Sequence, residues 1–371
     1  MNLRHIIEPS LVGAGNLVGS MIGAAFWLLL ASILDASSYG QINYQLALAS
    51  VLATASLLGF NNTIMTYVAK GNEILLKQAS FLILLLASIS SILLALLNQL
   101  SAAILVIGIV AFLFTVAEIL GRKRYRTYAL VVITNRGLQF GLSLSLYYIF
   151  GIEGIIIGYS LSSLILGYRL FLINKSSLSL SEIKPKMRFT MHAFSLSLSQ
   201  SLSLYFDKLI IGPIAGFAVL GLYQLGFQFL LFLAVIPASL FQYLLPQEAS
   251  GTERRVVKKL GLIVSITLAV VSYFSIPYVI QWFFPNYIEA ITSAQLMVLG
   301  VIPLTLNSIM NSRLLGRENS MPVLIGSAVY ITSLVSMLVM LKDVLGLTGF
   351  GLSVVVSLSL QSLTLWLVQK L

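Results

Sequence analysis

The sequence contains no cysteine, only two histidines and few charged side chains. Without cysteine the chain has no disulfide, no thiolate metal site and no cysteine nucleophile, although this absence does not identify a compartment. Charged residues are 9% of the 371 residues, against roughly 25% in soluble globular domains. With 58% hydrophobic residues and a mean hydropathy of +0.98, the composition excludes a soluble globule and indicates a polytopic membrane protein.

Twelve apolar segments are long enough to cross a bilayer as helices, which takes about 20 residues each. In hydrocarbon, backbone amides must be satisfied inside a helix or a closed barrel, and these segments are too long and too uniformly apolar for barrel strands. The predicted fold class is therefore an all-α integral membrane protein with twelve transmembrane helices. The segments run over 9–34, 40–66, 78–98, 101–120, 127–150, 152–174, 189–213, 217–246, 256–284, 288–315, 321–342 and 346–369.

Basic residues predict the orientation of these helices. Every second connection is basic, including Lys123 after the fourth helix, Lys184 after the sixth and Arg254 after the eighth, whereas the other connections carry only Lys342. By the positive-inside rule both termini are then cytoplasmic, in a multi-pass protein of the cell membrane. The net charge of +10 follows the topology and does not form one basic face, so we expect no nucleic-acid partner.

A long basic connection after the sixth helix divides the chain into two halves. Aligning Gly40 with Gly221, a shift of 181 residues, matches a polar outer loop and an aromatic-rich apolar helix in each half. Because each half has six helices, both enter from the cytoplasm, which predicts a parallel repeat about a pseudo-two-fold axis along the membrane normal. A chance match of apolar sequence is the alternative. The predicted parts are an N-lobe over 1–174, a cytoplasmic connection over 175–188 and a C-lobe over 189–371.

The stretch at 191–223, which opens the second half, is interpreted as a helix with a polar stripe. Its Ser/Leu alternation has the two-residue period of a strand, but His192, Ser199 and Asp207 fall on one helical face, and membrane context favours the helix. Asp207 and Lys208, near the outer end, either serve function or anchor the outer loop. His192 is either a protonation site or a hydrogen-bonded interfacial residue. Asp207 and His192 are the candidate ion-coupling residues.

Three stretches carry a family resemblance: SILDASSYGQINYQLALASVLATASLLGFNNTIMTYVAKG at 32–71, YFDKLIIGPIAGFAVLGLYQLGFQFLLFLAVIPASLFQYLLPQEASG at 205–251, and FPNYIEAITSAQLMVLGVIPLTLNSIM at 284–310. The chain resembles lipid-linked oligosaccharide flippases of the polysaccharide-export type, in the multidrug/oligosaccharidyl-lipid/polysaccharide exporter superfamily. The resemblance covers the layout of the whole chain, although many relatives carry two further C-terminal helices. None of the shared features is a catalytic signature.

Arg136 is the first candidate for a role in transport. It lies nine residues into the fifth segment, roughly 13 Å from the inner end at 1.5 Å per residue, and so close to the bilayer midplane. Gln139, Ser143 and Tyr147 follow it on the same helical face. A midplane arginine costs from about 2.5 to well over 10 kcal/mol unless it faces protein or water, which makes it a functional candidate. The alternative is a structural ion pair with a carboxylate elsewhere.

The first helix adds further polar and small residues. Asn16 stands four residues before Ser20, a pair that either lines a cavity or joins helices by hydrogen bonds. Gly15, Gly19 and Gly23 are also spaced by four, which allows a neighbouring helix to approach closely. We expect the substrate to be bound by Arg136, Gln139, Ser143 and Asn16.

Topology and resemblance together predict an alternating-access flippase that moves a polyprenyl-diphosphate-linked oligosaccharide from the cytoplasmic to the outer leaflet for surface polysaccharide or glycan assembly. Arg136 attracts the diphosphate, while the lipid tail stays in hydrocarbon. The expected partners are the lipid-linked oligosaccharide, membrane lipids and glycan-assembly enzymes. The driving force is left open between a proton and a sodium gradient.

Two alternatives belong to other functional classes. An ion-coupled exporter of small molecules or drugs from the same superfamily favours interior carboxylates for cationic substrates, whereas this chain offers an interior arginine. A membrane enzyme of glycan assembly needs acid and base residues or a sizeable external loop. The sequence shows no phosphate loop, metal-ligand cluster or nucleophile elbow. We therefore expect no enzyme activity, no catalytic residue, no metal and no cofactor.

Overall fold

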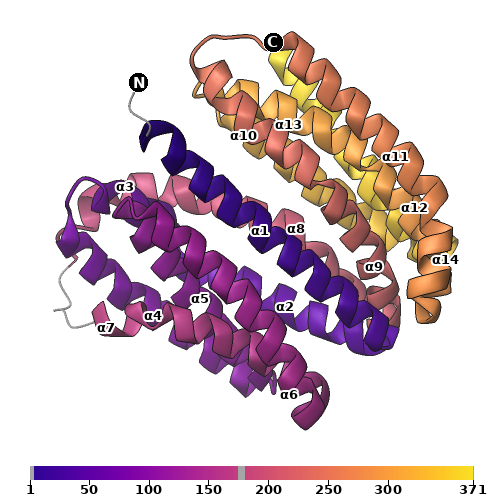
Figure 1. The fold of residues 1–371 in the computed structure, drawn as a ribbon, viewed down its shortest axis with the longest axis horizontal. Helices are drawn as coiled ribbons and strands as arrows, with labels where there is room; N and C mark the ends of the chain where they lie inside the picture. Colours follow the sequence, from indigo (N-terminus) through magenta and orange to yellow (C-terminus); the bar gives the residue numbers. More distant parts are fainter. Residues whose placement is uncertain (1–3, 174–179, 371) are drawn as a thin grey trace. The chain divides into compact units, whose positions relative to one another are not determined.

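The computed structural model describes residues 4–173 and 180–370, with side chains for 11–173 and 180–369. The beginning of the predicted connection 175–188 therefore lies outside the described residues. All elements of the described chain are helices (Figure 1). The first part contains α1 (Arg4–Ile33), α2 (Ala36–Leu57), α3 (Phe60–Val68), α4 (Glu73–Leu96), α5 (Leu100–Gly121), α6 (Tyr125–Gly167) and α7 (Arg169–Ile173). The second part contains η1 (Lys184–Lys186), α8 (Met187–Ala215), α9 (Phe217–Leu233), α10 (Val235–Ala249), α11 (Arg255–Phe283), η2 (Pro285–Ala290), α12 (Ile291–Leu299), α13 (Val301–Gly316) and α14 (Met321–Lys370).

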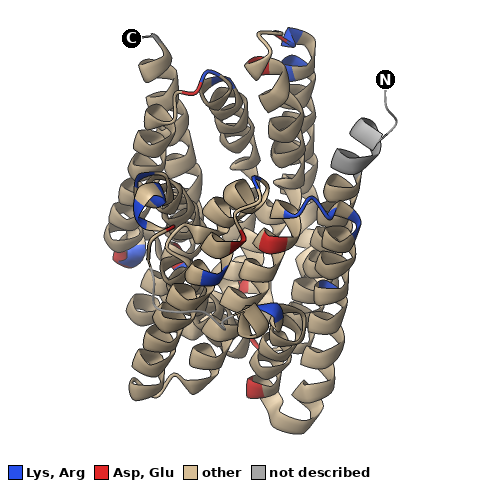
Figure 2. Cartoon of the chain, turned by 90° about the vertical axis from the view of Figure 1, so that its left-hand side faces the viewer, with Lys and Arg blue, Asp and Glu red and all other residues tan. Residues whose placement is uncertain are grey.

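The helices have the length and composition of membrane spans. Within the described residues, eight helical stretches are long and apolar enough to cross a membrane, or nine if α2 and α3, bent by 47° at their junction, form one span. The Ser-rich helix α8 is not among them. Charged residues interrupt the ribbon at few places (Figure 2). The chain is a multi-pass membrane protein.

Helix α6 is a hairpin of two antiparallel segments. It has 43 residues, twice what one crossing needs, and Gly151 within it has a φ of 60° and a ψ of −142°. A positive φ of this kind favours glycine, which has no Cβ to clash. The segments on either side pack together, since the hydroxyl of Ser143 donates to the carbonyl oxygen of Ile155 at 2.9 Å. The predicted division between 127–150 and 152–174 falls at this glycine.

Helix α14 repeats this arrangement near the C-terminus. It has 50 residues, and Gly346 has a φ of 52° and a ψ of −132°. A Cβ added to Gly326 would lie 3.0 Å from Cδ2 of Leu365, so the two segments lie side by side. Each of these long helices therefore supplies enough residues to cross a bilayer twice.

The chain divides into two compact units. Unit 1 consists of Met1–Phe26 and Gln45–Ser201, and unit 2 consists of Trp27–Tyr44 and Leu202–Leu371. The boundary passes inside α1, α2 and α8, so each of these helices contributes to both units. Within unit 1, α5 packs against both α4 and α6, and within unit 2, α13 packs against both α10 and α14. The lobe boundaries given above stay a prediction.

The N-terminal part of α8 packs on α3 inside unit 1. The hydroxyls of Thr63 and Thr190 lie 3.0 Å apart, and the amide of Asn62 donates to Ser197 at 3.4 Å. Gly59, which precedes α3 with a φ of 79°, faces the backbone of α8 so closely that a Cβ would overlap the carbonyl oxygen of Thr190. These contacts explain why α8 belongs to unit 1 as far as residue 201.

Two glycines bring α2 and α9 into backbone contact inside unit 2. A Cβ added to Gly40 would overlap the carbonyl oxygen of Phe217, and one added to Gly221 would overlap the carbonyl oxygen of Ala36. Only glycine permits this approach, because its Cα–H can point at a carbonyl oxygen. Phe217, which faces Gly40, lies four residues before Gly221, and Ala36, which faces Gly221, lies four residues before Gly40. The two contacts are therefore reciprocal, as in a two-fold interface.

Candidate functional site

Arg136 lies on the first segment of α6, where its side chain is partly buried. Its Nη1 donates a 2.9 Å hydrogen bond to Oε1 of Gln139, one turn further along the same segment. The same nitrogen lies 3.4 Å from the hydroxyl of Tyr159, which comes from the second segment. Gln139 is 4% exposed, so the guanidinium is held by a buried amide and a phenol. We call Arg136, Gln139 and Tyr159 the Arg136 cluster.

The glycine face of α1 lies against the same arginine. A Cβ at Gly23 would lie 3.8 Å from Nε of Arg136, and one at Gly19 would lie 3.6 Å from its Cγ. Two turns before Gly23, a Cβ at Gly15 would come within 2.8 Å of Cα of Ala129. The spacing of the glycines predicted a closely packed neighbour, and this neighbour is the first segment of α6. The small residues leave room for the long arginine side chain between the two helices.

Arg136 has no carboxylate partner among the described side chains, which cover 11–173 and 180–369. No described carboxylate oxygen lies within 4.0 Å of a guanidinium nitrogen of Arg136. Its positive charge is stabilised by the neutral groups of the Arg136 cluster, so the alternative of a structural ion pair receives no support from this part of the chain. The cations that do form ion pairs are Arg122, Arg169, Lys186, Lys208, Arg255 and Lys258.

Asn16 and Ser143, the other predicted substrate-binding residues, have partners of their own. Oδ1 of Asn16 accepts a 2.5 Å hydrogen bond from the hydroxyl of Tyr128, which lies about two turns before Arg136 on α6. Ser143 is fully buried and donates to a main-chain oxygen across the α6 hairpin. The structure thus places Asn16 in the same α1–α6 interface as Arg136 and places Ser143 in the core of the hairpin. Gln139 is the predicted residue that contacts Arg136 directly.

Two tyrosines complete this region, and sequence reasoning singled out neither. Tyr128 has a detectable signal, because it precedes Arg136 by eight residues and so lies on the same helical face. Tyr159 has no such signal. It reaches Arg136 only because the chain reverses at Gly151, and spacing along one helix does not reveal a contact across a turn.

A second charged group lies in unit 2, where Asp207 and Lys208 on α8 are 1% and 3% exposed. Nζ of Lys208 lies 3.1 and 3.2 Å from the two carboxylate oxygens of Asp207, and it donates to the main-chain oxygen of Leu204 at 2.7 Å. The hydroxyl of Tyr223 on α9 donates to Oδ2 of Asp207 at 2.6 Å. The two charges therefore compensate each other. We call this group the Asp207–Lys208 pair.

The two candidate ion-coupling residues have different surroundings. Asp207 is buried in unit 2, whereas His192 is exposed and belongs to unit 1. No described contact brings them together. Lys208 does not extend to the surface, as an anchoring lysine does; its Nζ lies 4.1 Å from the ring centroid of Phe227.

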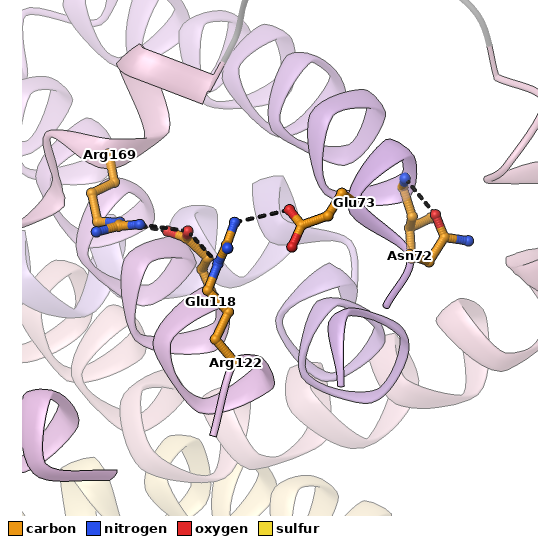
Figure 3. A network of polar contacts seen from close by, with 6 residues as sticks. Asn72, Glu73, Glu118, Arg122 and Arg169 are labelled. Atoms are coloured by element: carbon orange, nitrogen blue, oxygen red, sulfur yellow. Dashed lines mark hydrogen bonds and ion pairs between the residues drawn. The ribbon is translucent and has the colours of Figure 1, made fainter. Parts of the chain in front are cut away.

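Unit 1 contains an ionic network near the beginning of α4 and the end of α5 (Figure 3). Glu118, which is fully buried, accepts 2.7 Å hydrogen bonds from both Nε and Nη2 of Arg169 on α7. It also accepts a 2.9 Å bond from Nε of Arg122, whose Nη2 donates to Glu73 at 2.8 Å. The hydrogen bond to Glu118 raises the pKa of the Arg169 guanidinium. The four-residue spacing of Glu118 and Arg122 is visible in the sequence, but the contacts with Glu73 and Arg169 are not.

The donor groups at Arg136 indicate what this region can bind. Within residues 4–173 and 180–370, no group of three or more His, Asp or Glu side chains is placed to hold a metal ion. The Arg136 cluster offers a planar fork of donors that matches carboxylate or phosphate oxygens. The arrangement at Arg136 is therefore suited to an anionic ligand.

The fold is similar to solved structures of transporters over nearly the whole chain. The lipid II flippase MurJ, in an inward closed conformation, has a TM-score of 0.76 and 13% identity, with 97% of this chain and 87% of that chain covered. An inward-facing multidrug resistance MATE family transporter has a TM-score of 0.63 and 13% identity, with 95% and 94% covered. A MOP superfamily transporter from Pyrococcus furiosus has a TM-score of 0.55 and 14% identity, with 99% and 93% covered. The fold is that of the MOP superfamily, the multidrug/oligosaccharidyl-lipid/polysaccharide exporters.

The sequence itself identifies the family within this fold. The family model described as polysaccharide biosynthesis protein matches residues 10–250. This is more than half of the chain, and the chain belongs to that family. No curated protein sequence matches it. The matched range includes both Arg136 and Asp207, and the resemblance predicted from the sequence is confirmed.

Proposed function

We propose that the protein is an alternating-access flippase that moves a polyprenyl-diphosphate-linked oligosaccharide from the cytoplasmic to the outer leaflet. The observation that carries this proposal is the Arg136 cluster, in which a cation inside an apolar helix is held by neutral groups. Membership of the polysaccharide biosynthesis protein family supports a glycan as the cargo. The expected partners are the lipid-linked substrate, membrane lipids and glycan-assembly enzymes.

Arg136 binds the diphosphate in this proposal. A guanidinium stays charged at any accessible pH and presents its donors in a plane that fits phosphate oxygens. Gln139 and Tyr159 both engage Nη1, which limits the rotation of the fork. An anionic ligand supplies the compensating charge that the protein does not, so the ligand gains a charge-assisted contact in a region of low dielectric. Asn16 and Ser143 stay predicted substrate-binding residues.

We also propose that the helices form twelve spans in two six-helix lobes. The two segments of α6 and of α14 count as four spans, α2 with α3 counts as one, and α8 adds another despite its serines. The reciprocal contact of Gly40 with Gly221 supports the repeat, because it pairs the two aligned glycines at the same offset of four residues. Both termini are cytoplasmic in the cell membrane in this proposal. The lipid tail stays in hydrocarbon while polar helix faces accommodate the glycan.

The charged groups support an anionic cargo over a cationic drug. A carboxylate that binds an organic cation has to be free of other cations, but Asp207 already contacts Lys208, and Glu118 is held by two arginines. A glycan-assembly enzyme needs an acid or base beside its substrate, and the groups around Arg136 are an amide and a phenol. Coupling to a proton or sodium gradient through Asp207 or His192 stays a proposal.

The test replaces Arg136 and measures translocation of lipid-linked glycan in cells or proteoliposomes at matched protein levels. Arg136→Ala is expected to lower transport about 100-fold, since losing two hydrogen bonds to a charged group costs about 3 kcal/mol. Arg136→Lys keeps the charge but loses the planar fork and is expected to retain partial transport. Arg126→Ala, an exposed position at the start of the same helix, is the matched control and is expected to transport normally.

Two outcomes contradict this role of Arg136. Normal transport by Arg136→Ala makes the arginine dispensable and removes the main support for an anionic cargo. Loss of Arg136→Ala protein from the membrane, with normal accumulation of Arg136→Lys, assigns the arginine a structural role instead.

A further inference from the structure

The surroundings of Nζ of Lys208 are those of a cation-binding site. Both carboxylate oxygens of Asp207 lie within 3.2 Å of it, and the main-chain oxygen of Leu204 lies at 2.7 Å. On another side the ring centroid of Phe227 lies at 4.1 Å, and the negative face of an aromatic ring attracts cations. A carboxylate, a carbonyl and an aromatic face together replace the water that a monovalent cation loses on burial.

The carboxylate in this site is itself held in place. Tyr223, which is fully buried, donates to Oδ2 of Asp207 at 2.6 Å. The Tyr223 ring in turn stacks on Phe227, with centroids 5.9 Å apart and planes at 14°. The oxygens and the aromatic face are therefore fixed by contacts between α8 and α9 that do not involve Lys208. Removing the ammonium group leaves these ligands in place.

The side chain of Lys208 folds into this site instead of extending away from it. Lysines near the end of a membrane helix ordinarily extend toward water, but Lys208 is only 3% exposed. Its ammonium group folds back on the carboxylate of the preceding residue and on a carbonyl one turn before. The group is covalently attached, so it competes with dissolved ions at a high effective concentration.

We propose that Lys208 is a tethered cation that fills a monovalent-cation site formed by Asp207, the carbonyl group of Leu204 and the ring of Phe227. While the ammonium group is in place, Asp207 binds no free sodium or potassium ion. Removing the ammonium group opens the site to a free monovalent cation. The inference holds whatever the cargo is, and it means that a dissolved cation reaches Asp207 only by displacing Lys208.

The test compares purified full-length protein in sodium chloride with the same protein in N-methylglucamine chloride, at equal ionic strength and pH. The wild type is expected to unfold at the same temperature in both salts. Lys208→Met keeps an unbranched side chain without the charge, and sodium is expected to raise its unfolding temperature by several degrees, because an ion that binds only the folded state stabilises it. Lys259→Met, at an exposed lysine, is the matched control and is expected to show no sodium effect.

Further variants separate this site from a general effect of salt. The double variant Asp207→Asn with Lys208→Met has neither charge and is expected to lose the response to sodium. Lys208→Ala is expected to be stabilised by propylammonium chloride, which replaces the missing part of the side chain. If Lys208→Met does not accumulate, Lys208→Ala prepared in propylammonium chloride is used in its place to measure cation binding at the site.

Three results overturn the proposal. The first is a sodium response in the wild type that Asp207→Asn abolishes, which means that a free ion already occupies the carboxylate. The second is a Lys208→Met protein that responds to neither sodium nor potassium. The third is that Lys208→Met and Lys208→Ala both fail to accumulate while the double variant Asp207→Asn with Lys208→Met accumulates. This result means that free cations cannot enter the site. None of these measurements depends on transport. They leave the proposed movement of a lipid-linked glycan unaffected, and the first result bears only on the proposed coupling through Asp207.

Discussion

The two helices α6 and α8 each carry a positive charge that is held away from water, and the two charges are held in opposite ways. Arg136 in unit 1 is partly buried and is held by an amide and a phenol, whereas Lys208 in unit 2 is fully buried and contacts a carboxylate. A charge that the chain compensates itself needs no ligand. A charge that it leaves uncompensated gains most from an external anion. The comparison therefore distinguishes the proposed binding group from an internal ion pair by their partners, although both are charges on helices.

The side chains that surround the two charges also differ. Arg136 lies along Gly19 and Gly23 of α1, which contribute no side chain. The Asp207–Lys208 pair lies among aromatic rings, with Phe227 and Tyr223 in contact and Phe350 edge-on to Tyr223 at 6.5 Å. Glycine lets the backbone of α1 lie close to the first charge, whereas aromatic side chains pack around the second.

Removing Asp207 makes the second group resemble the first, and it is the change with the largest expected effect. Asp207→Ala leaves a buried ammonium group without a counter-charge and is expected to lower the free energy of unfolding by about 3–5 kcal/mol. Unfolding of the purified protein by heat or denaturant measures the loss. The double variant Asp207→Asn with Lys208→Met, which buries no charge, is the control and is expected to be more stable than Asp207→Ala. Equal stability of Asp207→Ala and the wild type contradicts the pairing of the two charges.

Adding a carboxylate beside Arg136 makes the first group resemble the second. The Cβ of Gly23→Asp lies 3.8 Å from Nε of Arg136, so its carboxylate reaches the guanidinium. We expect transport to fall at least about tenfold, equivalent to about 1.4 kcal/mol, because the new ion pair competes with an anionic substrate. The measurement is lipid-linked glycan translocation at matched protein levels.

Gly23→Asn is the matched control, since it has nearly the same shape without the charge. It is expected to transport better than Gly23→Asp. If both variants lose transport equally, the loss is caused by crowding at the α1–α6 interface. This result contradicts competition between the new carboxylate and an anionic substrate for Arg136.

The smallest effect is expected at Glu118, where the ion pairs are partly open to water. The side chain of Arg169 is 30% exposed, although Glu118 is buried. Arg169→Lys loses one of two parallel hydrogen bonds and is expected to cost about 1 kcal/mol of stability, because solvent screens the rest of the pair. Thermal unfolding measures the change, with Arg126→Lys as the exposed control. A loss as large as that of Asp207→Ala indicates that partial exposure does not weaken this network.

Much of the fold is predictable from the sequence because apolar length and turn residues are local signals. The predicted break between 127–150 and 152–174 falls at Gly151, and the start of the last predicted segment falls at Gly346. The exchange of helix segments between the two units is not predictable in this way. It depends on contacts such as Thr63 with Thr190, which are 127 residues apart, and a hydropathy pattern contains no information about them.

The candidate site was predictable only as far as one helix extends. Arg136 and Gln139 share a face, and their contact follows from spacing alone. Tyr159 lies beyond the turn of α6, and the glycines that face Arg136 lie on α1, so each requires knowledge of which helices pack together. The sequence places Lys208 beside Asp207, but the burial of Lys208 against Phe227 depends on the packing of α8 on α9.

The hairpin form of α6 matters for how the protein is made. During synthesis the first segment of α6 leaves the ribosome before the second, and inserting an arginine at the centre of a lone helix costs about 2.5–3.5 kcal/mol in cellular insertion. The hydroxyl that approaches Arg136 belongs to Tyr159, so it is absent until the chain has passed Gly151. The two segments are therefore most stable in the bilayer when they insert together as a hairpin. The first segment gains its contact with Tyr159 only after the ribosome has synthesised the second segment.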